Sequence, residues 1–117
     1  MYSPQVLDHF QHPRNSGQVE NATASVRLEN PACGDILELS AAIQSGKFAE
    51  IRFRAKGCVP SIACASALTE LIGGKTIQEA TRLTREDLLK ELGSLPEASQ
   101  HAGYLAMDAL RELLRKL

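Results

Sequence analysis

Three short stretches of the chain carry side chains that can bind a metal ion or sulfur. They are Pro31-Ala32-Cys33-Gly34-Asp35, Lys56-Gly57-Cys58 and Gln100-His101. Thiolates are soft ligands that select zinc, copper(I) or iron–sulfur clusters, and imidazole and carboxylate groups can complete such a shell. The three stretches therefore predict a thiolate-containing metal site, although the chain has no Cys-x-x-Cys pair to strengthen the signal.

Two of the three cysteines lie at the ends of predicted elements, where a side chain is accessible. Gly34 lets the backbone bend so that Cys33 and Asp35 can point at one object. Cys58 directly precedes a predicted helix, whose free N–H groups favour negative charge and hence the thiolate. Cysteines of this number are more often small buried residues, and it is their positions that shift the interpretation toward metal binding.

Alternating apolar and polar residues predict three β-strands in the first half of the chain. Charged residues occupy one face, as Arg52, Arg54 and Lys56 do in the third strand, which is typical of a sheet with one wet side. A tight turn around Gly46 favours antiparallel pairing of the second and third strands. The predicted strands cover residues 22–30, 36–44 and 48–56.

Helical spacing of apolar residues predicts the remaining elements. Their approximate ranges are 3–11, 60–72, 76–80, 84–92 and 97–117. Strands followed by helices predict an α+β fold. We expect one domain over residues 1–117, with a three-stranded antiparallel sheet, four to five helices packed on one of its faces and a long C-terminal helix.

Composition and charge argue against several functional classes. The chain has 13 basic and 14 acidic residues, and it has no Trp, so neither a basic nucleic-acid surface nor a base-stacking platform is expected. No apolar run approaches the roughly 20 residues that span a bilayer, and the N-terminus lacks a signal pattern. We therefore expect a cytoplasmic protein without nucleic-acid or membrane partners.

Motifs along almost the whole chain resemble, in order and in register, those of one protein family. They are Asp8-His9-Phe10-Gln11-His12-Pro13-Arg14-Asn15, Pro31-Ala32-Cys33-Gly34-Asp35, Gly57-Cys58 with Ser61-Ile62-Ala63, and Leu95-Pro96 before His101. The family is that of the IscU/NifU-type scaffolds for iron–sulfur cluster assembly.

The resemblance implies a scaffold that builds a labile [2Fe–2S] cluster and passes it to recipient apoproteins. Sulfur would come from a cysteine desulfurase, which performs the catalytic step, so the chain itself is not expected to be an enzyme. The implied ligands of the cluster or of iron are Cys33, Asp35, Cys58 and His101, and zinc would bind in the same pocket. A homodimer joined through the cluster site is also compatible with the resemblance.

The sequence departs from the family at Ala102, where relatives carry a ligand cysteine directly after the histidine. Cys64 is the tentative replacement ligand, and packing in the core is the preferred alternative for it. Because Ala102 cannot bind a metal ion, a second function is also considered. The chain would then be a zinc-binding or regulatory relative that no longer builds clusters. A third hypothesis is a plain interaction module with inert cysteines.

The histidines of the N-terminal motif receive a structural interpretation. His9 and His12 are expected at the end of the first helix, with His9 packing against its neighbours rather than binding metal. Arg14 and Asn15 are expected to order the N-terminal arm.

Overall fold

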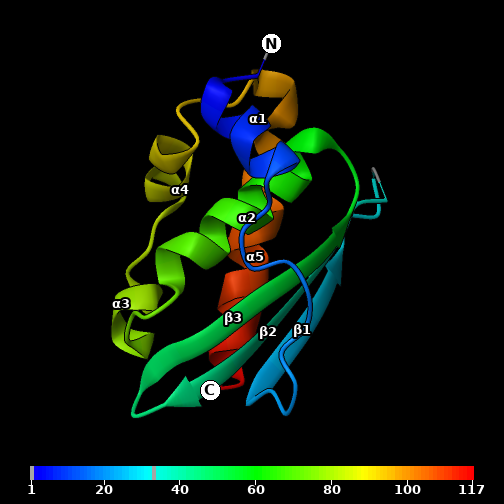
Figure 1. Cartoon of the computed structure of the whole chain (residues 1–117). Coiled ribbons are helices and arrows are strands. Elements are labelled where there is room, and N and C mark those ends of the chain that lie inside the picture. The colour runs from blue at the N-terminus through cyan, green and yellow to red at the C-terminus, as the bar shows by residue number, and fades with distance from the viewer. Residues whose placement is uncertain (1, 33) are drawn as a thin grey trace.

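A three-stranded antiparallel sheet with helices against it forms the structure, a computed structural model that describes residues 2–32 and 34–117 (Figure 1). The strands lie in the order β1-β2-β3 and span Ala24–Glu29, Ile36–Gln44 and Lys47–Lys56. The helices are α1 (Pro4–Gln11), α2 (Val59–Ile72), α3 (Ile77–Thr81), α4 (Arg85–Glu91) and α5 (Gln100–Arg115), with a 3₁₀ turn at Glu97–Ser99 before α5. This architecture confirms the predicted fold class.

One face of the sheet is apolar and buried, and the other is charged. Val26, Leu39 and Phe53 lie opposite one another across the three strands, and each is at most 8% exposed. At the adjacent positions of β2 and β3, Glu38 and Arg54 are paired on the outer face at 3.1 Å. Successive strand residues point to opposite faces, so the alternation in the sequence sets which side is dry.

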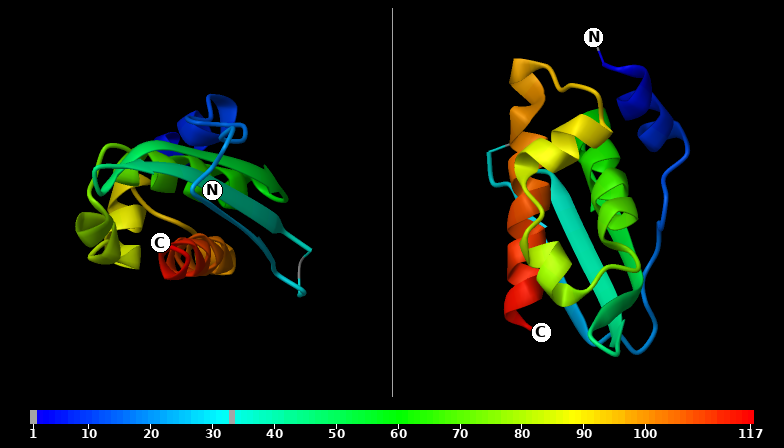
Figure 2. Two further views of the ribbon diagram at one scale, coloured as in Figure 1. Left: turned by 90° about the horizontal axis from the view of Figure 1, so that it is seen from below. Right: turned by 90° about the vertical axis from the view of Figure 1, so that its left-hand side faces the viewer.

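The helices cover the apolar face of the sheet. α2 packs on β3, α5 packs on β1 and β2, and α2 and α5 lie side by side in front of the sheet in the right view of Figure 2. α1 packs on α2, and α4 contacts both α2 and α5. The prediction of helices gathered on one face is therefore confirmed.

The segment between α1 and β1 runs along the free edge of β3 before it crosses to the other side of the sheet. Gly17 N–H donates to the carbonyl of Phe53 at 2.8 Å, and Phe53 N–H donates to the carbonyl of Asn15 at 2.9 Å. Val19 N–H then donates to Ser40 Oγ on the outer face at 2.9 Å. The segment thus occupies hydrogen-bonding groups that an edge strand would otherwise expose.

The helix boundaries differ from the predicted ranges by one to three residues, and two of the starts lie next to the predicted ligand residues. α2 begins at Val59, so Cys58 is its N-cap residue and Pro60 lies in the first turn, where a missing N–H costs nothing. The predicted helix 97–117 starts as the 3₁₀ turn, because Ser99 N–H donates back to the carbonyl of Pro96 before α5 begins. Among the described residues, no helix is long and apolar enough to cross a membrane.

Candidate metal centre

Three ligand-type side chains from distant parts of the chain meet at one end of the sheet. His101 Nε2 lies 3.5 Å from Asp35 Oδ2 and 3.8 Å from Cys58 Sγ, and Cys58 Sγ lies 3.5 Å from Asp35 Oδ2. Asp35 precedes β2, Cys58 precedes α2, and His101 lies in the first turn of α5. The three side chains can therefore share one ion.

The separations match those of a tetrahedral ion. With bond lengths of about 2.3 Å to sulfur, 2.0–2.1 Å to nitrogen and 2.0–2.2 Å to oxygen, tetrahedral angles place the ligand atoms about 3.4–3.6 Å apart. Sulfur, nitrogen and oxygen here lie 3.5–3.8 Å apart. Shifts of a few tenths of an ångström would complete three corners of the shell.

Cys58 owes its position to the junction between β3 and α2. Its backbone is extended, with φ −79° and ψ 169°, and its carbonyl accepts the first hydrogen bond of α2, from Ile62 N–H at 3.2 Å. The half-buried thiol therefore lies at the positive end of α2, where unpaired N–H groups favour an anion.

Asp35 is held in place from two sides. The residue is 4% exposed, and its carboxylate accepts a hydrogen bond from Ser61 Oγ. Gly57 lies on the other side with φ +155°, and a Cβ built on it would come within 2.3 Å of Asp35 Oδ1. Only a residue without a side chain lets the backbone pass this close to the carboxylate.

His101 presents a defined nitrogen to the centre. Its Nδ1 lies 3.2 Å from the carbonyl of Ala98, and a carbonyl only accepts, so Nδ1 carries the proton in this contact. The lone pair of the neutral ring is then on Nε2, which faces Asp35 and Cys58. Metal-bound histidines are commonly oriented by such a bond from the second nitrogen.

Ser61 is a member of the site that the sequence analysis missed. Its Oγ lies 3.2 Å from Cys58 Sγ and donates to Asp35, so it contacts two of the three ligand-type residues. Residues three apart on a helix share a face, and this spacing from Cys58 is the signal that would have found it.

The remaining predicted residues lie elsewhere or outside the described residues. Cys33 is not among the described residues. Cys64 is fully buried in the apolar core, and loss of hydration there raises the pKa of its thiol to about 12. Ala102 is 1% exposed and packs in the same core. The structure thus brings together Asp35, Cys58 and His101, and it does not place Cys64 in that group.

Comparisons with known proteins agree on one family. The NifU-like N terminal domain family matches residues 1–116. The chain is 41% identical over 114 residues to the iron–sulfur cluster assembly scaffold protein IscU 1 of Archaeoglobus fulgidus, which covers 97% of this chain and 74% of that protein. It is 35% identical over 120 residues to the mitochondrial iron sulfur cluster assembly protein 2 of Saccharomyces cerevisiae, covering 98% and 76%.

A solved structure with the same fold is the N-terminal part of a nitrogen-fixing NifU-like protein from Brucella abortus. It superposes with a TM-score of 0.81 over 97% of this chain and 92% of that one. The sequences are 16% identical, so this likeness is evidence for the fold alone.

Proposed function

Because the chain belongs to the family of NifU-like N-terminal domains, we propose that it is a scaffold for assembly and transfer of a labile [2Fe–2S] cluster. Its relatives are named iron–sulfur cluster assembly scaffold proteins, which supports the scaffold role. Scaffold proteins of this kind are not enzymes, in agreement with the expectation from the sequence.

The observation that carries the proposal is the convergence of Cys58, Asp35 and His101 on one point. Cys33, which lies outside the described residues, would supply a further thiolate. A shell that mixes thiolate with imidazole and carboxylate holds iron less firmly than four thiolates would, because oxygen is a harder donor than sulfur. Weaker binding suits a cluster that has to leave.

The same geometry supports exchange with partner proteins. The His101 side chain is 35% exposed, so the centre lies near the surface rather than in the core. A cysteine desulfurase would deliver sulfur there, recipient apoproteins would take the finished cluster, and a second copy of the chain could share it. The cytoplasmic location inferred from the sequence stays a prediction.

Anaerobic reconstitution tests the proposal. The purified chain is incubated with ferrous iron, cysteine, a cysteine desulfurase and a thiol reductant, which supplies the electrons that convert persulfide sulfur to sulfide. Visible absorption is followed together with bound iron and sulfide. We expect two iron and two sulfide per cluster, and loss of most of the chromophore in Cys58→Ala and His101→Ala.

Two matched controls separate ligation from general damage. His12→Ala removes an exposed histidine from the end of α1, and Cys64→Ala removes a buried thiol, so both variants should keep the chromophore. Absence of any iron-dependent chromophore in the wild-type chain would contradict the proposal.

Zinc binding without cluster assembly is the second candidate function. Ala102 favours it, because an alanine at this position supplies no thiolate and a set of sulfur, nitrogen and oxygen donors suits zinc. Zinc retained through purification, with no cluster formed under the conditions above, would support this alternative. Restoration of cluster formation by Ala102→Cys would point to the missing thiolate as the cause.

A further inference from the structure

A second group of ligand-type side chains lies where α1, α2 and α4 meet. His9, Glu70 and Glu91 each offer one ligand atom, and these atoms all lie within 4.8 Å of one another. Glu70 follows Cys58 by twelve residues along α2, which at 1.5 Å per residue is about 18 Å. The group is therefore separate from the candidate metal centre.

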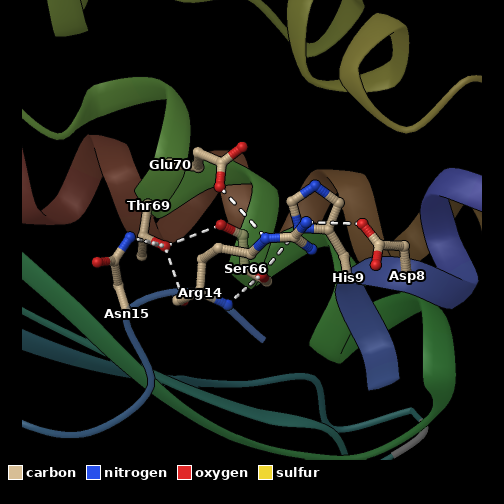
Figure 3. A network of polar contacts seen from close by, with 7 residues as sticks. All are labelled: Asp8, His9, Arg14, Asn15, Ser66, Thr69 and Glu70. Carbon is tan, nitrogen blue, oxygen red and sulfur yellow. Dashed lines mark hydrogen bonds and ion pairs between the residues drawn. The ribbon is translucent and has the colours of Figure 1, made fainter. Parts of the chain in front are cut away.

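His9 is oriented as a ligand would be. The residue is 4% exposed, and its Nδ1 lies 2.8 Å from Ser66 Oγ (Figure 3). Ser66 Oγ also accepts a hydrogen bond from Arg14 N–H at 2.8 Å, and a hydroxyl oxygen has two lone pairs, so it can accept from both groups. In the tautomer with the proton on Nδ1, the ring donates to Ser66 Oγ and the lone pair on Nε2 is directed away from Ser66.

The side chains around His9 carry a net negative charge, which favours binding of a cation. Asp8, Glu70 and Glu91 are acidic, and Arg14 is the basic side chain among them, so three negative charges against one positive leave an excess of two. Arg14 binds Asp8 at 2.6 Å but reaches Glu70 only at 3.4 Å. Strong charge-assisted bonds measure about 2.7–2.9 Å, so Glu70 is held loosely.

We propose that His9, Glu70 and Glu91 bind a divalent transition-metal ion that joins α1, α2 and α4. Imidazole with carboxylates suits zinc, iron(II) or manganese(II). Burial lowers the pKa of His9, which keeps the ring neutral and able to bind at neutral pH. Bound metal would tie the N-terminal helix to the body of the protein, in place of the purely structural role expected for His9 from the sequence.

Zinc binding to a variant that lacks the ligands of the candidate metal centre tests the proposal. Cys33→Ala, Cys58→Ala and His101→Ala are combined in the full chain without an affinity tag, and Zn²⁺ is titrated by calorimetry after circular dichroism has verified the fold. We expect one Zn²⁺ per chain. Adding His9→Gln or Glu91→Gln should weaken binding at least about tenfold.

Matched controls come from the same helices. His12→Gln alters an exposed histidine just after α1, and Glu86→Gln alters an exposed carboxylate of α4, so neither should change the affinity. In the chain with its candidate metal centre intact, His9→Gln should lower the zinc stoichiometry from two to one. This measurement tests the proposed site at His9 even where the triple variant fails to fold. Equal zinc affinity and stoichiometry with and without His9 would overturn the proposal, whether or not the candidate metal centre builds a cluster.

Discussion

Two ligand groups of the candidate metal centre are oriented by a neighbouring residue. Ala98 fixes the ring of His101 through Nδ1, and Ser61 fixes the carboxylate of Asp35. Groups held this way lose less conformational freedom on binding, because their rotamers are already set. The affinity of the centre should therefore depend on residues that never touch the ion.

Gly57 is one such residue, and Gly57→Ala should disturb both stability and metal binding. A methyl group at this position would collide with Asp35 Oδ1, and the φ of +155° is strained for any residue with a side chain. We expect a loss of about 1–3 kcal/mol in the free energy of unfolding and weaker zinc binding. Urea unfolding and zinc titration measure the two effects. Gly46→Ala also lies at positive φ but has open space around it, so it should alter stability only.

Cys58 and Cys64 should respond in opposite ways to substitution by alanine. Cys64 is fully buried and its thiol pKa is raised to about 12, so Cys64→Ala should cost about 1 kcal/mol of stability and leave metal affinity unchanged. Cys58→Ala should weaken metal binding at least about tenfold with little effect on stability. Competition with a chromogenic chelator measures affinity. Equal loss of affinity in the two variants would make Cys64 a ligand.

At the scale of elements, α2 contacts both the candidate metal centre and the N-terminal arm. Its first turn carries Ser61 beside the candidate metal centre, and its later turns carry Ser66 and Thr69 beside the N-terminal arm. Asn15 Nδ2 donates to Thr69 Oγ1 at 3.3 Å, and Thr69 Oγ1, which lies 2.8 Å from the carbonyl of Ser66, also lies 3.3 Å from the carbonyl of Arg14. Figure 3 shows that Asp8, His9, Arg14 and Asn15 all gather along this one helix. The arm is therefore ordered by polar bonds to α2, as the sequence analysis expected for Arg14 and Asn15.

Ser66→Ala tests how much these bonds contribute to docking of α1. The substitution removes the partner of both His9 Nδ1 and Arg14 N–H, and a polar group left buried without a partner costs about 1–3 kcal/mol. We expect that loss in the free energy of unfolding, with faster hydrogen exchange in α1. Ser94→Ala, at an exposed loop position, should change neither quantity. Unaltered exchange in α1 of the Ser66 variant would contradict this role.

At the scale of the whole molecule, burial of His9 should make stability depend on pH. Burial, and then the charge of Arg14, lower the pKa of His9 below its ordinary value of 6.5, against the opposing charges of Glu70, Glu91 and Asp8. The unfolded chain therefore binds a proton more readily than the folded one. The stabilisation is fully present above pH 6.5 and is lost as the pH falls from there through the folded pKa.

Urea unfolding at several pH values between 7.5 and 5, in the presence of a chelator, measures this effect. The free energy of unfolding should fall toward acid in the wild-type chain, and the fall should be smaller in His9→Gln. His12→Gln, which alters an exposed ring, should keep the wild-type slope. An identical slope in the His9 variant would show that other groups govern the pH dependence. Asp8 should contribute little here, because its hydrogen bond to Arg14 lowers its pKa and keeps it ionised over this range.

Much of the fold could be predicted from the sequence because its signals are local. Alternation in β2 and β3 sets which face of the sheet is dry, and the capping box of Thr84 and Asp87 marks the start of α4. The 3₁₀ turn before α5 was not predicted, since residues 97–99 have an ordinary helical pattern. Whether these residues form a 3₁₀ turn or an α-helix depends on how the preceding loop joins α5 in the packed structure. The spacing of apolar residues in the sequence does not contain this information.

The sequence by itself determined the family, the sheet with its helices, and the residue types able to bind metal. Which of those residues share a site was decided only by the tertiary structure. Asp35, Cys58 and His101 are separated by up to 66 positions, and only the packing of β2, α2 and α5 brings them within bonding distance of one ion. The same packing buries Cys64 and brings His9 close to Glu70 and Glu91. Periodicity can be read from residues that are neighbours in the sequence, whereas contacts between elements join residues that are far apart in it.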